Sequence, residues 1–177
     1  EITLRQETNY PWDGEVILTV GSLPKPLKKE VRLRIPDWCR SYGVAVNGEE
    51  ISPVTIEKGY VVIQKQWNEG DEITLNMDMP VEMVASAPQV KENIGKRAVQ
   101  RGPLVYCAEE TDNNDFENLL LTKGTSFAPA FDKTVLGGVT VIDAVTDDSV
   151  IRLIPYYAWD NREAGEMKVW INYNDEQ

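Results

Sequence analysis

The sequence predicts an all-β chain, and three observations lead to that class: apolar and polar residues alternate, turn signals separate the alternating segments, and a helical period is missing. The clearest segment is Val31–Ile35, in which Val, Leu and Ile would face a core while two Arg face solvent. Turn dipeptides such as Asn47-Gly48 follow at short spacing. No stretch keeps an apolar period of about 3.6 residues over three turns. An antiparallel β-sandwich is the most economical arrangement of such strands.

The strands of the first half follow from alternation and from β-branched content. Pro36 ends the strand that begins at Val31, because proline has no N–H to donate to a ladder. The turns Asp13-Gly14 and Lys58-Gly59 separate neighbouring strands in the same way. The strands expected in this half are 2–6, 16–20, 31–35, 60–64 and 72–77.

The second half repeats this pattern after a looser, polar connection. The alternation weakens from Met79 to Gln89, and the polar, Gly-containing segment 91–96 follows. We therefore expect two tandem antiparallel β-sandwich subdomains, 1–84 and 85–177, each near the lower size limit for independent stability. The strands expected in the second are 97–100, 104–108, 139–142, 150–154 and 168–171.

The segment from Glu109 to Gly138 has no assigned structure or role, apart from a short strand or turn at 119–121. Irregular stretches of this length inside a compact domain are uncommon. Such a stretch is usually either functional or wrongly assigned, and the sequence leaves both readings open.

Charge excludes two classes of partner. Eighteen Lys and Arg oppose 29 Asp and Glu, which gives a formal net charge of −11. Phosphate backbones and anionic lipid surfaces attract basic proteins and would repel this one. No apolar run approaches the length of a membrane span. We expect neither a nucleic acid nor a membrane as partner.

The chain has no histidine, which removes the commonest general base and the commonest metal ligand. Ser-His-Asp chemistry, Cys-His chemistry and His-ligated zinc therefore cannot be built within it. The two cysteines, Cys39 and Cys107, lie far apart and lack metal-binding spacing. They could pair with each other, although two buried free thiols are the simpler interpretation.

Carboxylate pairs are the only catalytic arrangement that this composition permits, and glycosidases use two of them. The candidates by proximity are Asp112 to Asp115, Asp147 with Asp148, and the series Asp160, Glu163 and Glu166. None is specific, because acidic clusters in an acidic protein are usually solvated loops. Asp112 to Asp115 also resembles a Ca²⁺ loop, but it lacks the Gly and Glu of an EF-hand. We expect no catalytic residue and no metal ligand.

Aromatic residues gather in three segments that join a proline to the end of a strand: Tyr10–Trp12, Pro36–Arg40 and Pro155–Trp159. Large aromatics often cap the core of a small β domain or pack one subdomain on another. The alternative is that they form an interface or stack on sugar rings. The candidate interface or sugar-stacking residues are Trp12, Trp38, Tyr156, Tyr157 and Trp159.

The same segments resemble the β-L-arabinofuranosidases of glycoside hydrolase family 127, once catalogued as a domain of unknown function. The resemblance keeps its order along nearly the whole chain. The matching motifs are Tyr10-Pro11-Trp12-Asp13-Gly14, Leu33-Arg34-Ile35-Pro36-Asp37-Trp38-Cys39, Val46-Asn47-Gly48, residues 95–107, residues 154–162, Gly165-Glu166-Met167 and Val169-Trp170.

The resemblance implies that the chain is a C-terminal, non-catalytic β region of a larger glycosidase. In that family an N-terminal (α/α)₆ barrel carries the catalysis, with a cysteine nucleophile at a zinc site and a Glu acid/base. Nothing in this sequence corresponds to that barrel, so no catalytic residue is carried over and zinc is expected only in the barrel.

The resemblance and the aromatic segments together lead to three hypotheses. The first is an accessory module that packs on the barrel and contributes a homodimer contact. The second is a carbohydrate-binding module that recognises arabinose-containing glycans through its loop aromatics. The third is a carboxylate glycosidase working alone, for which we expect no activity. The sugar specificity of the parent and the compartment stay open, whether periplasmic, exported or cytoplasmic.

Overall fold

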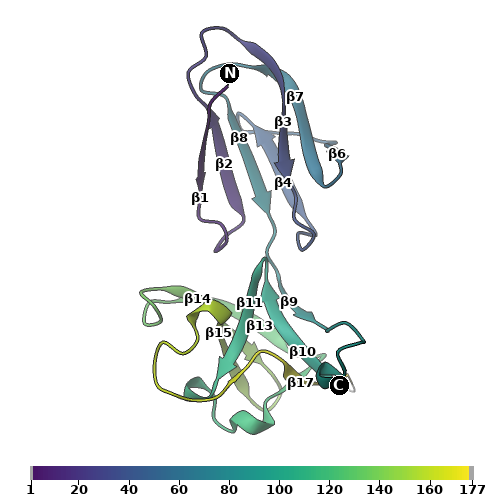
Figure 1. Ribbon diagram of the computed structural model, residues 1–177, viewed down its shortest axis with the longest axis vertical. Helices are drawn as coiled ribbons and strands as arrows, with labels where there is room; N and C mark the ends of the chain where they lie inside the picture. The colour runs from purple at the N-terminus through teal and green to yellow at the C-terminus, as the bar shows by residue number, and fades with distance from the viewer. Residues whose placement is uncertain (1, 176–177) are drawn as a thin grey trace. The chain divides into compact units, whose positions relative to one another are not determined.

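The computed structural model describes residues 2–175. The chain folds into two compact units, Glu1–Met79 and Pro80–Gln177. Strands form both units, and the helical elements within the described residues are four short 3₁₀ turns (Figure 1). The predicted all-β class is confirmed. The division falls between residues 79 and 80 rather than after residue 84, because strand β9 (Val81–Val84) is hydrogen-bonded to strand β10 (Lys96–Arg101) of the second unit.

The first unit is a sandwich of two antiparallel sheets. One sheet has the order β1-β2-β8-β4-β5 and the other has the order β3-β7-β6. In the larger sheet the last strand, β8, lies between β2 and β4. The strands are β1 (Leu4–Thr8), β2 (Glu15–Val20), β3 (Leu27–Arg34), β4 (Tyr42–Val46), β5 (Glu49–Glu50), β6 (Thr55–Glu57), β7 (Tyr60–Trp67) and β8 (Glu72–Met77).

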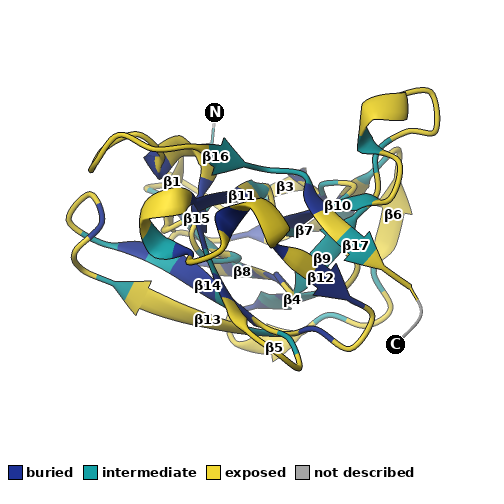
Figure 2. Ribbon diagram, turned by 90° about the horizontal axis from the view of Figure 1, so that it is seen from below, coloured by how far each residue is buried: buried dark blue, intermediate teal, exposed yellow. Residues whose placement is uncertain are grey.

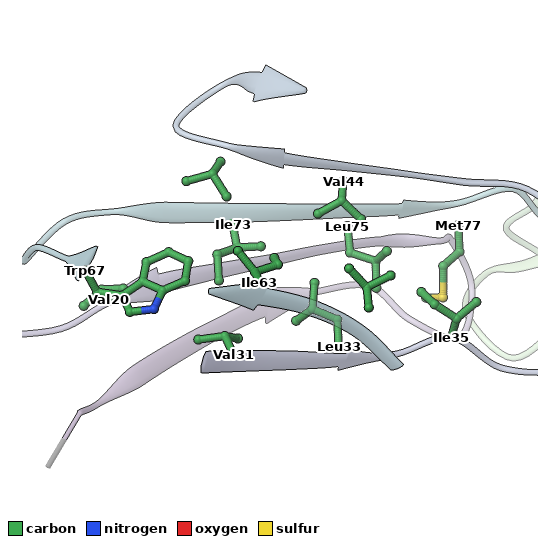
Figure 3. Packing of buried hydrophobic residues seen from close by; sticks show 12 residues of the cluster. Val20, Val31, Leu33, Ile35, Val44, Ile63, Trp67, Ile73, Leu75 and Met77 are labelled. Atoms are coloured by element: carbon green, nitrogen blue, oxygen red, sulfur yellow. The ribbon is translucent and has the colours of Figure 1, made fainter. Parts of the chain in front are cut away.

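The core of the first unit lies between these sheets and follows from the alternation (Figure 3). Val31 pairs with Ile63 across β3 and β7, and both are buried because both point to the same face. Trp67 is fully buried, and its indole Nε1 donates a hydrogen bond of 3.0 Å to the carbonyl of Lys29. Burial of each such apolar side chain contributes about 1.5–3 kcal/mol.

The turn between β1 and β2 needs a glycine at position 14. A Cβ built there would lie 1.9 Å from the carbonyl oxygen of Met77, which is far inside van der Waals contact. The carbonyl of Gly14 also accepts a 2.9 Å hydrogen bond from the backbone N–H of Met77. The turn therefore lies directly against the end of β8.

The strands of the second unit are joined in one hydrogen-bonded sheet rather than in two separate sheets. Its strands follow the path β12-β17-β10-β11-β15-β14-β13, with β9 paired to β10 and β16 paired to β11. All pairs are antiparallel except β12 with β17. The remaining strands are β11 (Leu104–Glu109), β12 (Leu120–Thr122), β13 (Ser126–Asp132), β14 (Val139–Val145), β15 (Val150–Pro155), β16 (Met167–Lys168) and β17 (Ile171–Asn174).

This sheet buries residues on both faces. On β11, Tyr106 and Ala108 belong to one apolar cluster, whereas Cys107 between them belongs to another. The unassigned segment 109–138 helps to cover these clusters: it forms the 3₁₀ turns η2 (Glu110–Asp112) and η3 (Phe116–Asn118), then β12 and β13. Figure 2 shows β14 largely buried and the neighbouring edge strand β13 largely exposed.

Candidate functional site

Three aromatic side chains stand at the surface directly after β15. We call residues 156–162 the aromatic loop; it begins with the 3₁₀ turn η4 (Tyr156–Ala158). Tyr156 and Tyr157 are each 46 % exposed and Trp159 is 36 % exposed, while Ala158 between them is fully buried. The rings of Tyr156 and Trp159 lie 6.5 Å apart at an angle of 34°. Ala158 therefore packs into the unit, while the three aromatic rings on either side of it remain exposed to solvent.

The aromatic loop is closed by an ion-pair network at its far end. Arg162 donates from Nη1 to Asp112 Oδ1 at 2.7 Å and from Nη2 to Asp112 Oδ2 at 2.5 Å. The same Nη2 donates to Oε2 of Glu109. These hydrogen bonds, first to Asp112 and then to Glu109, raise the pKa of the Arg162 guanidinium above its usual value. Arg162 therefore holds the loop to β11 and η2 as a permanent cation.

Glu109 is the buried member of this network, with a side chain only 6 % exposed. Its Oε1 accepts a 2.8 Å hydrogen bond from the backbone N–H of Asp160, which has a left-handed φ of 58°. Both carboxylate oxygens are thus occupied, as a buried charge requires. The carboxylate of Glu109 thereby holds the aromatic loop at Asp160 and at Arg162.

Asn113, also buried, fixes the segment that presents Asp112. Its Nδ2 donates to the carbonyls of Glu109 and Arg152 at 2.8 and 3.0 Å, and its Oδ1 accepts from the N–H of Arg152 at 2.8 Å. Asp115, a few residues on, accepts instead from Nδ2 of Asn118 at 2.7 Å. The acidic residues of the cluster Asp112 to Asp115 therefore have different partners: Asp112 binds Arg162, and Asp115 binds Asn118.

The candidate residues of the first unit lie in different surroundings. Trp12 is 50 % exposed in the turn after β1. Trp38 is half-buried against the core of that unit, and its ring stacks on Tyr10 at 6.4 Å and 16°. The structure thus brings Trp38 to Tyr10, and Tyr156 to Trp159. An interface or sugar-stacking role for Trp12, Trp38, Tyr156, Tyr157 and Trp159 stays a prediction.

Both cysteines are free thiols. Cys107 is fully buried on β11, and this burial, with Glu109 nearby, raises its pKa to about 12. Cys39 is partly exposed; its burial raises the pKa, and its Sγ donates to the carbonyl of Ser41 at 3.1 Å.

Metal-ligating residues do not converge in the part of the chain that the structure describes. Among residues 2–175, no three His, Cys, Asp or Glu side chains are grouped so that they could hold a metal ion. Over the same range, no helix is long and apolar enough to cross a membrane.

Two tandem β units with an anchored aromatic loop define an all-β module, and comparison with known proteins places it in a family. The family model for the β-L-arabinofuranosidase GH127 middle domain matches residues 1–79, and that for the glycoside hydrolase family 127 C-terminal domain matches residues 81–172. The chain belongs to glycoside hydrolase family 127. The resemblance found in the sequence motifs is confirmed.

Individual relatives agree with this assignment. A non-reducing end β-L-arabinofuranosidase of Bifidobacterium longum subsp. longum is 38 % identical over an alignment 198 residues long, which covers 96 % of this chain and 30 % of the relative. A solved family 127 β-L-arabinofuranosidase from Geobacillus stearothermophilus T6 is 41 % identical with a TM-score of 0.88, covering 98 % of this chain and 31 % of that one.

A second solved family 127 β-arabinofuranosidase is 31 % identical with a TM-score of 0.87, and the match covers 98 % of this chain and 32 % of that one. The chain therefore spans about 30 % of the length of the curated relative that it matches.

Proposed function

We propose that this chain is the non-catalytic accessory region of a larger family 127 glycoside hydrolase and that it packs on the catalytic barrel of that enzyme. The observation that carries the proposal is the match to the middle and C-terminal domains of the family, over about 30 % of a relative's length. The zinc site and the acid/base of the reaction would then belong to the barrel.

We assign the aromatic loop as the contact with the barrel. Its exposed rings are Tyr and Trp, the residue types that dominate the buried centres of protein interfaces. The bonds from Arg162 and Asp160 to Glu109 hold the loop before any partner arrives, which lowers the entropic cost of association. A loop fixed by a buried charge is suited to docking.

The test is association between this chain and the barrel of its parent, produced as a separate polypeptide and mixed in an analytical ultracentrifuge. We expect a complex, and we expect Trp159→Ala to weaken it by about ten-fold or more. Phe131→Ala is the matched control, since Phe131 is 65 % exposed on the edge strand β13. If the unmodified chains never associate, the proposal fails. Sedimentation of the chain alone tests the homodimer contact.

A carbohydrate-binding module is the second candidate, and the exposure of Trp12 and of the Tyr156 and Trp159 pair favours it. Aromatic faces of this kind suit sugar rings, which present C–H groups on one side. Saturable binding of an arabinose-containing oligosaccharide, lost in Trp12→Ala or in Trp159→Ala, would support this candidate. The absence of saturable binding to every arabinose-containing oligosaccharide tested would exclude the carbohydrate-binding candidate.

A further inference from the structure

A separate hollow of about 240 Å³ lies where β10, β17 and η3 meet, and it shares no residue with the aromatic loop. Lys96 on β10 and Asn172 on β17 are paired across the sheet, so their positions are fixed by the ladder. Figure 2 shows these two strands side by side. The lining residues are Lys96, Glu117, Leu119, Lys168, Trp170 and Asn172.

The lining of the hollow combines two apolar residues with four polar ones. Trp170 is half-buried between β16 and β17, and Leu119 is the other apolar residue of the lining. Small-molecule sites use this combination: apolar surface gives affinity, and a few placed polar groups give orientation. The volume is below the roughly 300–1,000 Å³ typical of drug-sized ligands, which indicates a ligand of one ring.

One lysine of the hollow is already committed. Lys168 donates from Nζ to the carbonyl of Phe116 and to Oε2 of Glu117, both at 3.0 Å. Its ammonium also lies 4.3 Å from the centroid of the Phe116 ring. Lys168 and Glu117 therefore neutralise each other, with the Glu117 side chain 73 % exposed at the rim of the hollow.

The other polar groups have unused bonding capacity. Within residues 2–175, the Lys96 ammonium, the Trp170 indole N–H and the Asn172 side-chain amide have no hydrogen-bond or ion-pair partner. Because the Lys168 and Glu117 charges cancel, Lys96 gives the hollow a local positive charge in a chain whose net charge is −11. An unpaired cation and a tryptophan in the same lining suit an anionic ligand with an apolar side.

We propose that this hollow binds a single sugar residue that carries a carboxylate, a uronic acid. The C–H face of the ring would stack on Trp170, the carboxylate would meet Lys96, and ring hydroxyls would bond to Asn172 and to the carboxylate of Glu117. The site is independent of the contact with the barrel, so it stands or falls separately from the proposed function.

The test is titration of the 177-residue chain with D-galacturonate and D-glucuronate, followed by tryptophan fluorescence and by amide chemical shifts. We expect saturable binding with a Kd on the order of 1 mM, as suits a one-ring ligand held by few contacts. Galactose and L-arabinose should bind about ten-fold more weakly or not at all. Acetate tests the carboxylate alone: if it binds as tightly as the uronates, the sugar proposal is overturned.

Variants separate the two contacts. Lys96→Met should lower uronate affinity by about ten-fold, and Lys96→Arg should restore part of it. Lys123→Met is the matched control, because Lys123 is exposed in the turn before β13 and does not line the hollow. Asn172→Ala, on an exposed side chain, should weaken binding of the uronates and neutral sugars alike. Unchanged uronate binding in both Lys96→Met and Asn172→Ala would overturn the proposal.

Discussion

Arg162 lies against the buried carboxylate of Glu109, a residue 53 positions earlier in the chain. Asp112 binds the same guanidinium, so one arginine joins the aromatic loop to both β11 and η2. Two like charges share one cation in a partly buried place, and the surroundings of Glu109 offer little water. Removal of that cation is therefore more serious than the loss of an ordinary surface pair.

Arg162→Met should lower the free energy of unfolding by about 3–5 kcal/mol, the range for breaking a buried ion pair by removal of one partner. Chemical denaturation followed by tryptophan fluorescence measures this. Arg5→Met is the control, because the Arg5 and Glu7 side chains are 75 % and 53 % exposed; it should cost less than about 1 kcal/mol. Equal effects of the two substitutions would contradict the structural importance of Glu109.

Stability should fall in alkali because of Cys107. Its pKa is about 12 in the folded chain against an ordinary 9.0, so above pH 9 the unfolded state releases a proton that the folded state keeps. The stabilisation is intact below pH 9 and is lost between pH 9 and 12, by about 4 kcal/mol in all. Urea titrations across this range should show a shallower decline for Cys107→Ala, whereas Cys39→Ala should retain most of the slope.

Gly14→Ala should destabilise the first unit, because the added methyl group meets the Met77 carbonyl at 1.9 Å and the backbone must move. Overpacking of this kind costs about 1–3 kcal/mol. Gly43→Ala is the matched control: a Cβ there has nothing within 4 Å, and alanine in a strand is favoured over glycine by about 0.5–1 kcal/mol. Thermal unfolding should move in opposite directions for the two variants.

Trp67→Phe tests the core of the first unit. The substitution removes the indole hydrogen bond to the Lys29 carbonyl and leaves space in a fully buried site. We expect a loss of about 1–3 kcal/mol, from the unpaired carbonyl and the void together. Trp12→Phe, at an exposed site, should change stability by less than about 0.5 kcal/mol. Comparable losses would show that Trp12 is buried in solution.

Most strands could be predicted, because a half-buried strand alternates apolar and polar residues along its length. Val31–Ile35 and 72–77 show this clearly, and both lie in the sandwich of the first unit. The strand β4 was missed, and the strand predicted over 168–171 is wrong, because residues 169–170 separate β16 from β17. In the segment 109–138 the short strand or turn expected at 119–121 is confirmed by β12, whereas β13 was missed because it is exposed at an edge. Such strands are specified by distant neighbours rather than by local period.

The surface aromatics could be proposed as candidates from their position beside prolines, but their anchor could not. Glu109 and Arg162 are distant in sequence, and nothing local distinguishes a buried glutamate from the other acidic residues. Asp112 was visible only as a member of an acidic cluster. The hollow around Trp170 was missed for the same reason, because Lys96 and Asn172 meet only when β10 and β17 pair.

The order of strand pairing also governs how the chain can fold as it is synthesised. β8, the last strand of the first unit, is inserted between β2 and β4, and β17 of the second unit is inserted between β10 and β12. Each unit is therefore incomplete until its final strand has emerged from the ribosome. The first unit can complete its sheet once residue 77 has left the ribosome. A nascent chain halted before residue 171 would lack β17, which is the only strand partner of β12 in the described sheet.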